Sequence, residues 1–133
     1  MPLPALFKNL RLPVIASPLF IVSGPELVIA QCKAGVVGSF PALNARPASQ
    51  LDEWLHQITE ELAAWNRDNP DTPAAPFGVN LIVHQSNPRL EEDLALCVAH
   101  KVPLVISSMG ARADVNQAVQ VYGGVTLHDV SAR

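Results

Sequence analysis

Five short runs of apolar residues recur along the chain. They are rich in valine and isoleucine, and within each run the apolar residues are nearly continuous and do not alternate with polar ones. Such a run is typical of a strand that is buried on both faces, as in a parallel sheet. We therefore predict strands at residues 14–16, 36–40, 77–83, 104–108 and 125–130.

Segments with helical spacing separate these runs. The first is predicted to begin with Ser23 as N-cap and Glu26 as its capping-box partner, and to end at Gly35. The second begins near Ser49 and carries an apolar stripe for four turns, which we expect to belong to the core. The stripe consists of Leu51, Trp54, Leu55, Ile58, Leu62 and Trp65. Residues 69–76 are rich in proline and are predicted to form a surface connection.

The two remaining helices have clear ends in the sequence. The third is predicted to begin with Asn87 as N-cap and Pro88 in the first position, and to end near His100. The fourth is predicted at residues 113–122, where Gly123 ends it.

Strands and helices thus alternate along the whole chain, with short connections. This order requires a mainly parallel sheet with right-handed crossovers, and so an α/β fold. We expect residues 1–133 to belong to a single domain. The alternation alone does not distinguish a closed barrel from an open sheet.

Composition and charge narrow the class of protein. The 133 residues are 49% hydrophobic and 16% charged, which is enough apolar material for a packed core. The net charge of −3 and the absence of a basic block exclude nucleic acid as an expected partner. No apolar stretch approaches the ~18 residues of a membrane span, so we expect a cytoplasmic protein. Cys32 and Cys97 lack metal-ligand spacing and are interpreted as small buried residues.

The common nucleotide and nucleophile motifs are missing. The chain contains no G-x-G-x-x-G, no phosphate-binding P-loop and no G-x-S-x-G elbow. Polar residues at predicted strand ends remain as candidates, namely Ser17, Asn80, Ser107, Ser108, His128 and Asp129. The amide of Asn80 is suited to bind the edge of a heteroaromatic ring. His128 and Asp129 are strand neighbours that must point to opposite faces, so at most one of them reaches a site.

The other histidines suggest less. We interpret His56 and His100 as solvated residues on helix surfaces. His84 follows the third predicted strand and is a candidate for the mouth of a site.

Four segments together resemble one family in order and spacing. They are residues 13–27, the Gly-Ser-Phe-Pro-Ala-Leu-Asn run at 38–44, Gly-Val-Asn-Leu at 78–81, and the turn at 107–111. They are similar to nitronate monooxygenases, formerly called 2-nitropropane dioxygenases. The resemblance implies a TIM barrel that holds FMN at the carboxyl ends of its strands and oxidises alkyl nitronates with O2 to a carbonyl compound and nitrite. Related members reduce quinones or enoyl thioesters.

The resemblance also implies where the flavin would bind. The family's turn after its first strand, which lies against the flavin, falls on residues 16–19, and its flavin-contacting asparagine falls on Asn80. The predicted FMN-binding residues are Ala16, Ser17, Pro18, Leu19, Asn80, Ser107 and His128. The family's catalytic histidine would lie beyond Arg133, so we predict no catalytic residue in this chain.

Length is the main departure from the family. A TIM barrel typically has ~250 residues, and this chain supplies about five of its eight strands. Our leading hypothesis is therefore the N-terminal portion of an FMN-dependent nitronate monooxygenase, from a truncated gene, a frameshift or a partial sequence. The alternative is a non-catalytic half-barrel that folds by pairing its open sheet edges with a second copy or another half-barrel.

Overall fold

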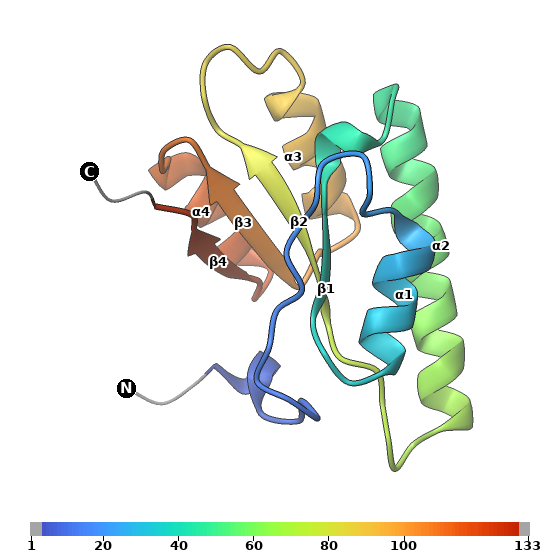
Figure 1. Ribbon diagram of the computed structural model, residues 1–133. Helices are drawn as coiled ribbons and strands as arrows, with labels where there is room; N and C mark the ends of the chain where they lie inside the picture. The colour runs from blue at the N-terminus through green and yellow to red at the C-terminus, as the bar shows by residue number, and fades with distance from the viewer. Residues whose placement is uncertain (1–3, 131–133) are drawn as a thin grey trace.

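The computed structural model describes residues 4–130, and its centre is a sheet of four parallel strands in the order β1-β2-β3-β4 (Figure 1). The strands are β1 (Gly38–Pro41), β2 (Phe77–Ile82), β3 (Leu104–Ser108) and β4 (Val125–His128). Each strand lies beside the next one in sequence. This is the strand order of a TIM barrel, and the fold is part of one.

Helices connect the strands and cover one face of the sheet. They are α1 (Pro25–Lys33), α2 (Ala48–Asp68), α3 (Leu90–Ala99) and α4 (Ala113–Val121), with short 3-10 turns η1 (Ala5–Phe7) and η2 (Ala42–Asn44). Figure 1 shows α1 and α2 packed side by side. Because every crossover joins neighbouring strands with the same hand, all the helices lie on the same side. None of the helices between residues 4 and 130 is both long and apolar enough to cross a membrane.

The two faces of the sheet therefore differ, and we call them the helix face and the open face. Val79, Leu81 and Val105 point to the helix face and belong to the buried core. Asn80 and Ile106 lie beside each other in the register and point the other way, to the open face.

The core confirms most of the predicted stripe of α2. Leu51, Leu55, Ile58 and Leu62 are buried, and Trp54 contacts Phe40 edge-on with ring centroids 5.7 Å apart. The prediction is wrong for Trp65, which lies outside the core near the end of α2 and lines a cavity.

The first predicted strand is reduced to one bridge. Ile15 pairs with Val37 in parallel, and residues 14–16 form no longer ladder. The physical reason is that Pro13 and Pro18 bracket the segment and neither has an N–H to donate. The sheet has four strands, with this bridge continuing it beside β1. The strand predicted at 125–130 ends at His128, two residues early.

Two helix starts also differ from the prediction. The N-cap of α1 is Gly24, followed by Pro25, and the Ser23 hydroxyl instead accepts a hydrogen bond from the Leu19 N–H at 2.8 Å. Proline in the first helical position has no N–H that a cap would need to satisfy. In α3, Asn87 Oδ1 accepts from the Arg89 N–H within a turn that precedes the helix, which begins at Leu90. Helix α2 begins at Ala48, one residue before the predicted start.

Candidate functional site

A chain of hydrogen bonds crosses three strands at their carboxyl ends. Asn80, which is only 9% exposed, donates from Nδ2 to the Ile106 carbonyl at 2.9 Å and to Ser108 Oγ at 2.7 Å. The Ser108 hydroxyl donates in turn to Asp129 Oδ2 at 3.3 Å. We call Asn80, Ser108 and Asp129 the polar row. It lies on the open face, at the edge where parallel α/β proteins bind ligands.

The surroundings of Asn80 determine which way its amide points. A backbone carbonyl can only accept a hydrogen bond, so the atom facing Ile106 must be the amide nitrogen. The side-chain oxygen consequently points elsewhere, and no residue between 4 and 130 donates a hydrogen bond to it. Asn80 thus presents a fixed acceptor to the open face.

Strand alternation separates the predicted site residues into two groups. Ser107 lies beside Leu81 and His128 in the register and points with them to the helix face. Ser107 is fully buried, and its hydroxyl has no hydrogen-bond partner within residues 4–130. His128 Nε2 lies 3.2 Å from Asn116 Nδ2 of α4. The structure does not bring Ser107 and His128 to the polar row.

The residues that do join Asn80 are the sequence neighbours of those two. Asp129 contacts Ser108 on the open face and His128 contacts α4, which confirms that the pair points to opposite faces. The signal that separates them is the register. Since Asn80 lies beside Ile106, the serine two residues further along β3 shares its face.

The turn at residues 16–19 lies at the same edge of the sheet, beyond β1. The Ala16 N–H donates to the Val37 carbonyl at 2.8 Å, and the Ala16 carbonyl accepts from the Ser39 hydroxyl. Ser17 is exposed, Pro18 is half-buried and Leu19 is 49% exposed. One strand separates this turn from β2, a lateral distance of about 10 Å at the usual strand spacing.

Asn44 holds the loop that continues from this turn. Its Nδ2 donates to the carbonyls of Leu19 (3.0 Å) and Ser23 (2.9 Å), and its Oδ1 accepts from the Ile21 N–H (3.0 Å). Ile21 has a φ of 68°, a left-handed conformation that is strained for a β-branched residue. The loop exposes the apolar side chains of Phe20, Ile21 and Val22. No sequence motif pointed to this anchoring role of Asn44.

A cavity of about 490 Å³ lies at the carboxyl ends of β1, β2 and β3, and its lining includes Met109, the neighbour of Ser108, but none of the three residues of the polar row. Leu43, Ile82 and Met109 provide apolar surface, and Arg46 and Arg89 provide positive charge. Ile82 follows Asn80 by two residues and shares its face. The volume lies within the range of about 300 to 1,000 Å³ that is usual for small-molecule sites.

Ser86 lines this cavity, whereas His84, the candidate for the mouth of a site, is not among the residues that line it. His84 Nδ1 lies 2.7 Å from Ser86 Oγ. His84 itself is exposed.

A buried ion pair supports one wall. Arg89 Nη2 lies 2.8 Å from Asp93 Oδ1, and the Arg89 guanidinium also donates to the Ala42 and Ala45 carbonyls after β1. Asp93 is fully buried, and burial raises its pKa above the usual value even though Arg89 opposes the shift. The pair ties α3 to the loop that follows β1.

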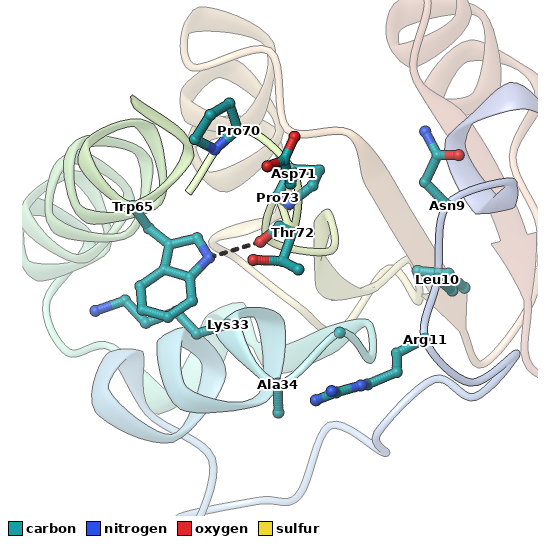
Figure 2. Close-up of a pocket in the computed structure, with 11 residues that line it drawn as sticks. Asn9, Leu10, Arg11, Lys33, Ala34, Trp65, Pro70, Asp71, Thr72 and Pro73 are labelled. Carbon is teal, nitrogen blue, oxygen red and sulfur yellow. Dashed lines mark hydrogen bonds between the residues drawn. The ribbon is translucent and has the colours of Figure 1, made fainter. Parts of the chain in front are cut away.

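A second cavity, of about 700 Å³, lies at the opposite end of the sheet (Figure 2). Lys33 Nζ lies 5.5 Å from the centre of the Trp65 ring, and Trp65 Nε1 donates to the Thr72 carbonyl at 3.1 Å. In TIM barrels this end contributes to stability, whereas the carboxyl end carries the chemistry. We therefore assign the candidate site to the carboxyl end, although its cavity is the smaller of the two.

The two cysteines provide no nucleophile for this site. Both are free thiols, as predicted, and both are buried. Burial raises the pKa of Cys32 to about 11 and that of Cys97 to about 12, so neither thiol ionises near neutral pH.

Comparison with known proteins finds similarity in structure only. No protein-family model matches the chain, and no curated protein matches its sequence. FabK from Thermotoga maritima superimposes with a TM-score of 0.75 at 20% identity, over 96% of this chain and 36% of that chain. A point mutant of the same protein gives a TM-score of 0.73 at 19% identity, over 96% of this chain and 38% of that chain. This likeness shows the fold, and the chain spans less than two-fifths of the length of these neighbours.

Proposed function

We propose that this chain forms part of the FMN site of a flavin-dependent oxidoreductase, of the nitronate monooxygenase type. The observation that supports the proposal most directly is the side-chain oxygen of Asn80, which accepts no hydrogen bond from residues 4–130 and lies at the carboxyl end of a strand in a partial TIM barrel. The isoalloxazine ring of a flavin has an N–H on its pyrimidine edge, and an acceptor in this position fits it.

Each feature of the site has a role in this proposal. Asn80 binds the polar edge of the flavin, while Ser108 and Asp129 keep its amide from rotating. The turn at residues 16–19 covers a further part of the ring. Bound FMN would supply the redox chemistry, taking electrons from an alkyl nitronate and passing them to O2. No residue of this chain is proposed to remove a proton from the substrate.

A titration of the 133-residue protein with FMN tests the proposal. We expect stoichiometric binding, followed by quenching of flavin fluorescence, and an affinity at least tenfold weaker in Asn80→Ala. Asn80→Asp is the matched control, because it keeps the shape and the acceptor but cannot donate to Ile106. Equal FMN affinity in wild type and Asn80→Ala would remove the basis for the site.

Activity assays separate nitronate oxidation from the related reductions. A protein of the proposed type consumes O2 and forms nitrite from propyl-2-nitronate. Consumption of NAD(P)H with a quinone or an enoyl thioester, without nitrite from the nitronate, would favour the related reductases. We also propose a cytoplasmic location, in keeping with two free thiols in a reducing compartment.

A non-catalytic role through self-association is our second candidate. The sheet ends on one side at β4, whose residues are only half-buried or exposed, and on the other at the single Ile15 bridge. Exposed strand edges favour pairing with another chain. Light scattering and limited proteolysis of the purified protein test this candidate. A monomer that resists proteolysis would contradict it.

A further inference from the structure

Two histidines and an aspartate meet between α2 and α3, away from the strand ends. Asp52 and His56 lie one turn apart on α2, and His100 caps the carboxyl end of α3. Solvation alone was expected to explain both histidines, and for His100 this is wrong. Its side chain is only 12% exposed, and its Nε2 lies 2.7 Å from Asp52 Oδ1. We call Asp52, His56 and His100 the outer cluster.

The distances in the outer cluster are close to those around a metal ion. His56 Nε2 lies 3.8 Å from Asp52 Oδ2, the two imidazole rings meet edge-on with centroids 4.5 Å apart, and the three ligand atoms all lie within 4.8 Å of one another. Ligands about 2.0 to 2.1 Å from a tetrahedral zinc ion are separated by about 3.3 Å. His100 approaches Asp52 Oδ1 and His56 approaches Asp52 Oδ2, so the three side chains must rotate to bring one oxygen and two nitrogens to this spacing.

The donor set and its exposure favour zinc. Two imidazoles and one carboxylate are ligands that Zn2+ accepts, and three protein ligands leave a fourth position for water. The side chains of Asp52 and His56 are 45% and 61% exposed, so an ion can enter from solvent.

We propose that the outer cluster is a zinc site that links α2 to α3. The ion replaces the hydrogen that His100 and Asp52 share, and it draws His56 into the same coordination sphere. The ion holds α2 and α3 together on the helix face of the sheet, and it takes no part in the flavin site. The proposal therefore stands or falls independently of the function proposed above.

Zinc titration of the full chain, purified without a histidine tag and freed of metal, tests the site. We expect one Zn2+ per chain by calorimetry, release of protons on binding, and an increase of about 10 °C in the unfolding midpoint at a hundredfold excess over Kd. Co2+ in place of Zn2+ should give the visible absorption of a four-coordinate site with nitrogen and oxygen ligands.

Matched variants show whether the ion binds in the outer cluster. His56→Gln should weaken zinc binding by at least about 100-fold, more than loss of an outer-shell partner usually does. Because His56 is exposed, this variant should fold even if His100→Gln does not. His84→Gln changes another exposed histidine and should bind zinc as the wild type does. No stoichiometric binding, or equal binding by His56→Gln and wild type, would overturn the proposal.

Discussion

Ser107 and Ser108 are neighbours on β3, and yet they meet opposite environments. Ser107 is buried on the helix face, where its hydroxyl has no hydrogen-bond partner among residues 4–130, whereas Ser108 links Asn80 to Asp129 on the open face. His128 and Asp129 repeat the contrast one strand further on. On the helix face side chains serve packing, and on the open face the polar groups stay available to a ligand. Alternate residues of a strand point to opposite faces of the sheet, so a residue's position along the strand decides its place in the candidate site as much as its type does.

The largest expected difference between the faces is in packing. Leu81→Ala removes a fully buried side chain from the helix face and should lower the free energy of unfolding by about 4 kcal/mol. Leu127→Ala makes the same change on the open face, where the side chain is only half-buried, and should lower it by about 1 kcal/mol. Urea denaturation measures both. Equal losses would mean that the open face is packed as tightly as the helix face.

The next largest effect concerns the buried ion pair of Arg89 and Asp93. Arg89→Gln leaves the Asp93 carboxylate buried without its cation, and should lower the free energy of unfolding by about 3 kcal/mol at neutral pH. Burial already raises the folded pKa of Asp93, and the variant raises it further. Stability that depends on the protonated form is fully present below the unfolded pKa and is lost as pH rises through the folded pKa.

Acidification should therefore reduce the cost of Arg89→Gln. Denaturation curves at a series of pH values would show the deficit shrinking as Asp93 takes up its proton. Arg89→Gln with Asp93→Asn is the control, because it removes both charges and should be more stable at neutral pH than Arg89→Gln alone. A deficit that does not change with pH would contradict this account.

The sequence predicted the elements better than the positions of the side chains within the site. Apolar runs and helix stops predicted five strands and four helices, and four of these strands and all four helices form, because burial and backbone geometry act locally. Which of Ser107 and Ser108 joins Asn80 depends on the register between β2 and β3, and register is a relation between segments 26 positions apart, as in the pairing of Asn80 with Ile106. The reduced strand at 14–16 shows the same limit, since its prolines were visible but the missing ladder was not.

FMN affinity should also distinguish Ser108 from Ser107, with a smaller difference in free energy than the stability effects above. Ser108→Ala removes one of the two acceptors that hold the Asn80 amide, and should weaken FMN binding about tenfold. Ser107→Ala removes a buried hydroxyl that no residue of the described part of the chain partners, and should change FMN affinity less than twofold. Fluorescence titration measures both. A larger effect from Ser107→Ala would place the ligand on the wrong side of β3 for the proposed site.

The smallest expected effect concerns Asp129 on the open face and His128 on the helix face, at the end of β4. Asp129 is exposed on the open face, and its carboxylate should repel the phosphate of FMN, so Asp129→Asn should tighten FMN binding about twofold to threefold at low salt. Added salt should abolish this gain, because it screens exposed charges. His128→Gln changes a side chain held by Asn116 on the helix face and should leave the affinity unchanged at any salt concentration. If His128→Gln gives the salt-dependent change and Asp129→Asn does not, then the ligand lies against α4 on the helix face, and the open face does not carry the flavin site.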